Sequence, residues 1–230
     1  MDLRDVIAEA LKEDARTIPQ YLEYGAPALN EQEWLRYAGV PIYDQDSVKA
    51  TSEITSLMDQ ARQLLAGQCA YRVSFLVAPI TRDEEGYPIL PFAQHSEKLR
   101  ANLEGCNKVV LFAATIGAGI DRLIQRYERV KPQLALMLQG LGAERVESLC
   151  DAFNQAVSQA ASLRSGEVSA LEAPSMTHRR FSPGYGDLPI SVQKEFLACL
   201  DAERRLGITL NDSFLMSPSK SVTAIIGICG

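Results

Sequence analysis

The chain has 230 residues, of which 47% are hydrophobic and 23% are charged, a composition typical of one soluble globular domain. Its formal net charge of -6 argues against binding along a nucleic-acid backbone, which requires clustered Lys and Arg. Because it has no apolar run of the roughly 18 residues that a membrane helix needs, and its N-terminus is unlike a secretory signal, the sequence predicts a cytoplasmic protein without membrane segments.

The first 67 residues are expected to form an N-terminal helical region. In the opening segment, apolar side chains share one helical face, at Val6, Ala10 and Leu11. Residues 52–67 repeat this helical spacing and end near Gly67, a residue type common just after a helix. The stretch between these two helices mixes prolines with aromatic residues, which predicts an ordered wrap across the surface with short helical turns.

Residues 68–230 are expected to form an α+β core. Two β-like runs, "YRVSFLVAPI" from Tyr71 and "YPILPF" from Tyr87, flank the charged turn "TRDEEG" and predict a hairpin, with the prolines of the second run favouring a sheet edge. Residues 109–114 are wholly apolar and precede a glycine turn and a helical pattern that continues through Tyr127. This order predicts a strand, a tight turn and a helix.

Helical patterns dominate the next part of the chain. One extends from Gln133 to about Ser162, and within it Gly140 and Gly142 mark a bend where a neighbouring element can approach closely. Another covers residues 190–207 and ends at a glycine of the kind that caps helices. These patterns predict long helices packed against the strands.

The last segment, "SFLMSPSKSVTAIIGI" at residues 213–228, predicts a hairpin with its turn at residues 218–220. Taken together, the elements predict a single domain over residues 1–230. Its class is α+β, with antiparallel sheets flanked by several long helices.

Cysteine and histidine patterns argue against metal and disulfide chemistry. The five cysteines are odd in number, scattered and never spaced as CxxC, so they are expected to be reduced thiols that are mostly buried. His95 and His178 have no second His or Cys at ligand spacing, so no metal site is expected. No GxSxG elbow occurs, and no catalytic side chain is assigned.

The glycine turn "TIGAGID", residues 115–121, follows a strand and opens a helix, the setting in which a helix N-terminus can bind a phosphate. The third glycine of a dinucleotide fingerprint is missing, and no acidic residue ends a second strand at the expected distance. A close strand-to-helix turn is the favoured interpretation, and a small nucleotide-binding enzyme is the least favoured alternative.

The segment "RFSPGYGDLP", residues 180–189, has the local chemistry of a ligand loop. Pro183 fixes φ, Gly184 can adopt positive φ, and Tyr185 adds an aromatic face, so backbone polar groups can turn toward one side. Arg180 adds a planar cation that can bind a carboxylate with two hydrogen bonds. On these grounds alone, a structural turn and a binding site are equally supported.

This loop, followed by a helix and by "GITLNDSFLMSPSKSVTAIIGI", resembles the C-terminal activation domain of cobalamin-dependent methionine synthase. The family pattern is Arg-x-x-Pro-Gly-Tyr, a proline, a helix, a glycine and Ser-Phe-x-Met-x-Pro-x-x-Ser-Val. The matching positions are Arg180, Pro183, Gly184, Tyr185, Pro189, Gly207, Ser213, Phe214, Met216, Pro218, Ser221 and Val222. A weaker likeness at "VESLCDAF", residues 146–153, aligns Asp151 with an acidic residue that faces the ligand in the family.

The resemblance implies binding of S-adenosylmethionine and methylation of a cobalamin that a flavodoxin-like donor has reduced. It assigns the ligand carboxylate to Arg180, polar ligand atoms to backbone groups of Ser182 and Gly184, and the ligand or the corrin face to Tyr185. Asp151 would favour the positive charge of the ligand. The protein would orient two reactants whose own groups supply the reactivity.

The chain lacks the family's Asp-x-His-x-x-Gly cobalamin motif and zinc-ligating cysteines, so it is not a whole methionine synthase. The cobalamin would therefore belong to a partner, either a methionine synthase or another corrinoid protein, on which this chain acts in trans. The alternative is a non-catalytic module that docks on a corrinoid protein without binding S-adenosylmethionine.

Overall fold

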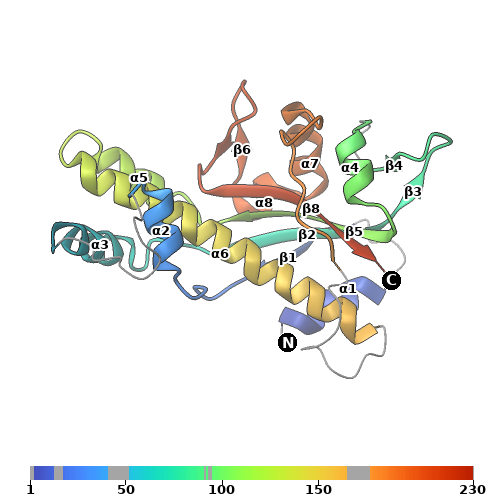
Figure 1. Cartoon of the computed structure of the whole chain (residues 1–230), viewed down its shortest axis with the longest axis horizontal. Helices are drawn as coiled ribbons and strands as arrows, with labels where there is room; N and C mark the ends of the chain where they lie inside the picture. Colours follow the sequence, from blue (N-terminus) through green and yellow to red (C-terminus); the bar gives the residue numbers. More distant parts are fainter. Residues whose placement is uncertain are drawn as a thin grey trace.

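The computed structural model describes residues 3–12, 18–40, 52–90, 92, 95–164 and 177–229. Its centre is a four-stranded antiparallel sheet with helices on both faces (Figure 1), which confirms the predicted α+β class. The strand order is β1-β2-β5-β8, comprising Gln20–Glu23, Arg72–Pro79, Cys106–Thr115 and Ser221–Cys229. Long-range antiparallel pairing thus joins the N-terminal, middle and C-terminal parts of the chain in one sheet.

Strand β5 organises the core because both of its faces are buried. It pairs with β2 on one side, with Phe112 opposite Phe75, and with β8 on the other, with Phe112 opposite Ala224. Alternate residues point to opposite faces, so Phe112 enters one apolar cluster and Leu111 enters the other. A strand that is buried on both faces has a continuous run of apolar residues, which is why this strand could be predicted from the sequence.

One face of the sheet is covered by the long helix α6, Pro132–Arg164, which crosses it diagonally (Figure 1). Phe153 from α6 packs against Phe75 and Phe112, with ring centroids 5.4 and 4.8 Å away. Around α6 lie α1, α2, α3 and α5, formed by Leu3–Lys12, Glu31–Tyr37, Ser52–Leu65 and Gly119–Tyr127. At Gly140 a Cβ atom would lie 2.7 Å from the backbone nitrogen of Ala38, so the predicted close approach to a neighbour is confirmed.

The other face carries shorter helices, α4, η1, α7 and α8, formed by Glu97–Asn102, Ile190–Val192, Gln193–Cys199 and Ala202–Leu206. The sequence predicts one continuous helix through the last three, and that prediction is wrong. Asp201 has φ of 51°, a left-handed conformation that separates α7 from α8. The predicted cap at Gly207 is confirmed by its φ of 70°.

Both predicted hairpins are wrong in their pairing. Strand β2 pairs with β1 and β5, and only the short strands β3 (Thr81–Arg82) and β4 (Pro88–Ile89) join across the predicted charged turn. Near the C-terminus, β7 (Met216–Ser217) pairs with β6 (Thr209–Leu210), whereas β8 pairs with β5. Both β2 and β8 are long apolar strands, and burying them beside β5 outweighs pairing with a neighbour in sequence.

The N-terminal region agrees with its predicted helices at α1 and α3, and Gly67 follows α3 with φ of 71°. It also supplies β1, an edge strand of the main sheet that the sequence patterns do not predict. Part of the predicted surface wrap, residues 41–51, lies outside the described residues. Within the described parts of the chain, no helix combines the length and apolar character needed to cross a membrane.

The prediction that all cysteines are reduced is wrong for one pair. Cys106, the first residue of β5, and Cys229, the last of β8, lie opposite each other and form a disulfide. Because 123 positions separate them in sequence, no local spacing indicates the pairing. Cys69, Cys150 and Cys199 are free thiols, as predicted.

Candidate functional site

The candidate site begins where residues 177–181 run beside strand β8. The Phe181 amide donates to the Ile225 carbonyl at 2.9 Å, and the Ile225 amide donates back to the Phe181 carbonyl at 2.8 Å. This reciprocal pair fixes the segment to the outer edge of the sheet, because β8 is the last strand. Arg180 is thereby held where its side chain reaches helix α6.

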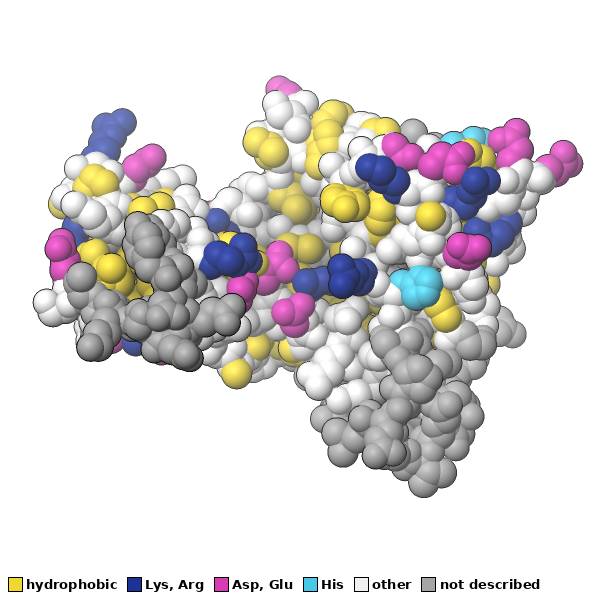
Figure 2. Space-filling view, in the orientation of Figure 1, with side chains coloured by type: hydrophobic (Ala, Val, Ile, Leu, Met, Phe, Trp, Pro, Cys, Tyr) yellow, Lys and Arg dark blue, Asp and Glu magenta, His cyan; other side chains and the backbone are white. Residues whose placement is uncertain are grey.

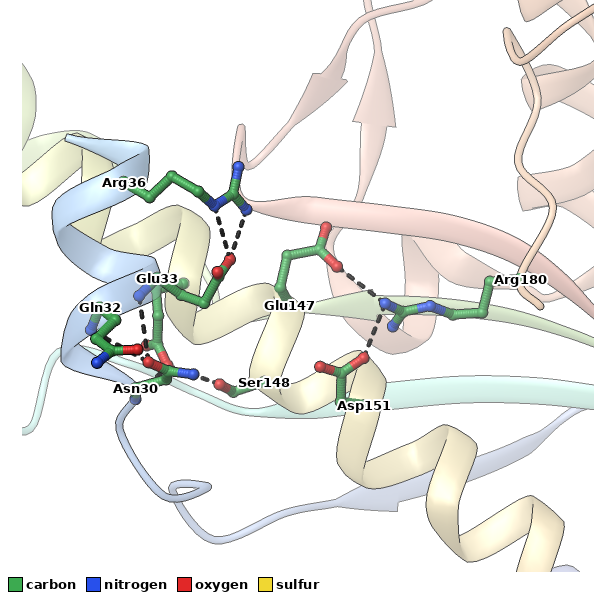
Figure 3. A network of polar contacts seen from close by, with 9 residues as sticks. Asn30, Gln32, Glu33, Arg36, Glu147, Ser148, Asp151 and Arg180 are labelled. Atoms are coloured by element: carbon green, nitrogen blue, oxygen red, sulfur yellow. Dashed lines mark hydrogen bonds and ion pairs between the residues drawn. The ribbon is translucent and has the colours of Figure 1, made fainter. Parts of the chain in front are cut away.

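The side chains of Arg180 and Asp151, which the family resemblance assigns to one ligand, lie in contact. Nη2 of Arg180 lies 2.9 Å from Oδ1 of Asp151 and 3.0 Å from Oε2 of Glu147 (Figure 3). Glu147 is a partner that sequence reasoning missed. Its signal is its place four residues before Asp151, because residues at that spacing share one face of a helix.

The two acidic side chains of this network are more exposed to solvent than the arginine. The side chain of Asp151 is 74% exposed and that of Glu147 is 39% exposed, whereas that of Arg180 is 23% exposed. Nη1 of Arg180 is buried and has no hydrogen-bond partner among the described residues. The three ionised groups carry a net charge of -1, so the site can accept both a hydrogen-bond acceptor at Arg180 and a positive charge near Asp151.

The loop that follows is closed by its own backbone. Gly184 has φ of 85° and donates its amide to the Leu188 carbonyl at 2.9 Å, while the Tyr185 amide donates to the Ser182 carbonyl at 3.0 Å. The amide of Gly184 is therefore committed within the loop. The carbonyl oxygen of Ser182 has a second lone pair and can still accept a hydrogen bond from a ligand.

Tyr185 is presented at the surface. Its side chain is 64% exposed, and its ring meets that of Phe181 edge to face with centroids 5.3 Å apart. Phe181 itself is buried in the apolar core. The loop thus holds one aromatic ring in place while leaving most of it available for contact with another molecule.

Asp187 ties the far end of the loop to helix α4. Its carboxylate accepts hydrogen bonds from the Ser96 hydroxyl, from the Glu97 amide at 2.8 Å and from the Lys98 amide at 3.4 Å. The Ser96 hydroxyl and the backbone amides hold the pKa of Asp187 below its usual value. Sequence patterns do not reveal this anchor, because the two segments are far apart in the chain.

The second part of the sequence motif runs from the β6–β7 hairpin, which contains Met216, into the start of β8 at Ser221. Gln193, just after the loop, accepts a hydrogen bond from the Thr223 hydroxyl of β8 at 2.6 Å. Beside it, a cleft of about 560 Å³ is lined mainly by the β6–β7 hairpin, including Leu210, Leu215 and Met216. Figure 2 shows charged side chains in a band across this face of the molecule, with hydrophobic side chains gathered above it.

The glycine turn at residues 115–121 has a structural explanation. Gly117 has φ of 80°, and a Cβ atom at Gly119 would lie 2.1 Å from the carbonyl oxygen of Gln68. The Asp121 carboxylate, in the first turn of α5, accepts the Ser219 amide at 3.0 Å and places a negative charge where a phosphate would bind. These contacts favour the predicted close turn over a dinucleotide site.

Two comparisons with known proteins give matches, and a comparison with curated proteins gives none. The chain is similar in structure to the crystal structure of the MetH reactivation domain bound to AdoHcy, with a TM-score of 0.67 and 15% sequence identity. That match covers 99% of this chain and 82% of the other, and shows a common fold. Residues 81–228 match the family described as "Vitamin B12 dependent methionine synthase, activation domain". The chain therefore belongs to the activation-domain family of vitamin B12 dependent methionine synthase.

Proposed function

We propose that this protein binds S-adenosylmethionine at the loop of residues 180–189 and supports reductive methylation of a cobalamin carried by a partner protein. The observation that carries the proposal is the orphaned Nη1 of Arg180, a buried donor beside two acidic side chains. Family membership and the similar fold of the MetH reactivation domain, whose crystal structure contains AdoHcy, support the same ligand class.

Arg180 fits the carboxylate of the ligand. A guanidinium donor that is buried without a partner costs free energy, and an incoming carboxylate oxygen supplies that partner. Glu147 and Asp151 hold the guanidinium through Nη2, so Nη1 keeps its orientation before the ligand arrives. The ion pairs therefore position Arg180 in advance, which lowers the cost of binding.

Asp151 and Glu147 fit the cationic part of the ligand. S-adenosylmethionine carries a sulfonium and an ammonium group, and the exposed carboxylate of Asp151 lies next to the group that binds the ligand carboxylate. Opposite charges at a partly exposed site attract with an energy of about 1 to 4 kcal/mol at 4 Å. The Ser182 carbonyl adds a neutral acceptor, and Tyr185 offers a flat surface to the ligand or to the corrin.

In the reaction that the family implies, the partner's cobalamin would be reduced by a one-electron donor and would then accept the methyl group of S-adenosylmethionine, leaving S-adenosylhomocysteine. The residues of this chain hold the ligand by its carboxylate and its charge, so its methyl group keeps one direction. Tyr185 stands at the surface where a second molecule can approach. The contribution of the protein is orientation of the two reactants.

Titration calorimetry with S-adenosylmethionine tests the binding step. Wild type should bind, and Arg180→Ala should bind at least about 30-fold more weakly, because a hydrogen-bonded charge pair is worth about 2 kcal/mol. Arg204→Ala is the matched control, since Arg204 forms an exposed ion pair with Asp201 away from the loop. Absence of heat with wild type would favour a docking module without this ligand.

A second titration separates the role of Asp151. Asp151→Asn should weaken S-adenosylmethionine more than S-adenosylhomocysteine, because only the former carries the sulfonium charge. Equal loss for both ligands would contradict the proposed charge selectivity.

Action in trans is tested by mixing the chain with a Co(II) corrinoid protein, a flavodoxin and S-adenosylmethionine without oxygen, and following methylcobalamin by its visible spectrum. Methylation that proceeds equally well without the chain would contradict the proposed function.

A further inference from the structure

Three metal-ligating side chains meet at one end of the sheet. Cys106 starts β5, Cys229 ends β8 directly opposite it, and His178 lies in the segment that pairs with the outer edge of β8. The His178 amide donates to the Gly227 carbonyl at 3.0 Å, which fixes the position of the histidine along the strand. Adjacent strands thus assemble a Cys-Cys-His cluster from residues that are distant in sequence, so sequence spacing could not reveal it.

The cluster has the dimensions of a single metal centre. The ligand atoms of the three residues all lie within 4.8 Å of one another, and Nδ1 of His178 is 3.7 Å from Sγ of Cys106. With metal–sulfur bonds of about 2.3 Å and metal–nitrogen bonds of about 2.0 Å, tetrahedral geometry places neighbouring ligand atoms roughly 3.5 to 3.8 Å apart. The imidazole therefore already stands at ligand distance from one sulfur.

The surroundings favour a cation held by thiolates. Cys106 is buried, and His178 and Cys229 are half-buried, so two thiolates here require a compensating positive charge. In the disulfide form, Nδ1 of His178 contacts the main-chain carbonyl of Asn102, at the end of α4. A metal bound at Nδ1 would take the place of this contact, with the neutral ring carrying its proton on Nε2.

We propose that Cys106, Cys229 and His178 form a redox-controlled site for a thiophilic divalent cation of the Zn²⁺ class, and that the disulfide is its oxidised, metal-free form. An external dithiol reduces the Cys106–Cys229 bond, giving two thiols and one external disulfide. Binding of Zn²⁺ then releases the two thiol protons and forms two metal–sulfur bonds. Within the described residues the cluster has three ligands, which leaves the fourth tetrahedral position to water or another small ligand.

The site would share its backbone segment with the proposed S-adenosylmethionine site. His178 and Arg180 are two residues apart in the segment held against β8 by the Phe181 and Ile225 pair. A metal bound at His178 would restrain this segment from its other end. The inference does not depend on the proposed function, because metal binding can be measured without S-adenosylmethionine or cobalamin.

Zinc binding by the full chain, reduced with a phosphine and handled without oxygen, tests the proposal. One Zn²⁺ per chain is expected by native mass spectrometry, and Co²⁺ substituted for Zn²⁺ should give a thiolate-to-metal charge-transfer band. Cys106→Ser and Cys229→Ser should each abolish the band, and His178→Ala should weaken Zn²⁺ binding at least about tenfold. Cys199→Ser, which changes a free half-buried cysteine elsewhere, should bind as wild type.

The same measurements can overturn the proposal. The proposal is contradicted if the reduced wild type binds no Zn²⁺, or if the Cys106→Ser and Cys229→Ser double variant binds it as well as wild type does. It is also contradicted if the oxidised chain binds Zn²⁺ as tightly as the reduced chain. Should the variants fail to fold, alkylation of the reduced wild type answers the question. Zn²⁺ should protect Cys106 and Cys229 from the reagent, and protection of Cys69 or Cys199 instead would exclude this cluster as the metal site.

Discussion

Helix α6 carries two arginine–carboxylate networks less than two turns apart, and they differ in what is left unsatisfied. In the first, the buried pair Glu144 and Arg145 is fully committed: Arg145 donates to both Glu144 oxygens, to the Pro27 carbonyl at 2.7 Å and to the Ala28 carbonyl at 2.9 Å. In the second, Arg180 uses Nη2 for Glu147 and Asp151, while Nη1 is buried without a partner among the described residues.

The difference separates a structural ion pair from a binding site. Glu144 also accepts the Asn30 amide at 2.8 Å, at the start of α2, so the first network fastens an N-terminal segment to α6. The second joins α6 to the edge of the sheet and keeps an exposed carboxylate and an unused donor. An arginine beside a carboxylate is thus a weak indicator of function. A buried guanidinium donor without a hydrogen-bond partner is a stronger one.

The largest expected effect comes from breaking the buried pair. Glu144→Gln should lower the free energy of unfolding by about 3 to 5 kcal/mol, because it leaves Arg145 charged and buried beside a neutral group. Urea denaturation measures the change. Glu33→Gln, in the exposed pair with Arg36, is the control and should leave the free energy of unfolding almost unchanged. Similar losses in the two variants would erase the distinction between the networks.

Arg180→Lys sharpens the comparison at the open network. Lysine keeps the charge and can still pair with one carboxylate, but it lacks the planar fork that holds two acids and a ligand together. S-adenosylmethionine affinity should fall by about 10-fold to 30-fold, with stability changed by less than about 1 kcal/mol. Calorimetry and urea denaturation on the same preparation provide both values. Wild-type affinity in this variant would show that charge alone suffices.

A smaller effect is expected from the loop beside Arg180. Gly184→Ala places a Cβ atom 2.9 Å from Cδ1 of Ile190 at a φ of 85°, so the variant should lose about 1 to 2 kcal/mol of stability. Gly25→Ala is the matched control, because a Cβ atom at Gly25 has open space around it. Thermal unfolding followed by circular dichroism compares the two. Equal melting temperatures would mean that the loop adapts without strain.

The smallest effect concerns acid stability at Asp187. Its pKa is lowered in the folded chain, so its contribution to stability is present above the unfolded-state pKa near 3.8 and is lost as the pH falls through the lower folded-state value. Asp187→Asn should therefore reduce stability at neutral pH and flatten its decline in acid. Urea denaturation as a function of pH measures this slope, with Asp212→Asn as a surface control. Parallel curves for wild type and Asp187→Asn would contradict the role of the carboxylate.

The sequence predicted those parts of the fold that have local causes. Periodicity located α1, α3, α5 and α6, and an unbroken apolar run located β5, because burial on a helical stripe or on both faces of a strand leaves a pattern in neighbouring residues. Strand partners left no such pattern. The pairing of β8 with β5 and the insertion of β1 at the sheet edge depend on contacts between distant segments.

The same distinction applies to the sites. Arg180 could be named because a family motif carries it, and Asp151 because residues 146–153 show a weaker likeness to the family; the structure places the two side chains 2.9 Å apart. Glu147 was missed although its helical spacing to Asp151 is visible in the sequence. The Asp187 anchor and the Cys106, His178 and Cys229 cluster could not be found, since each joins residues separated by dozens of positions.

The loop between Phe181 and Asp187 is fastened at both ends, to β8 by a reciprocal backbone pair and to α4 by a carboxylate at its N-terminus. A segment restrained in this way has little conformational entropy left to lose when a small molecule binds. The entropy that the loop loses on binding should therefore be small, so the enthalpy of its contacts with the ligand is offset less than it would be in a mobile loop.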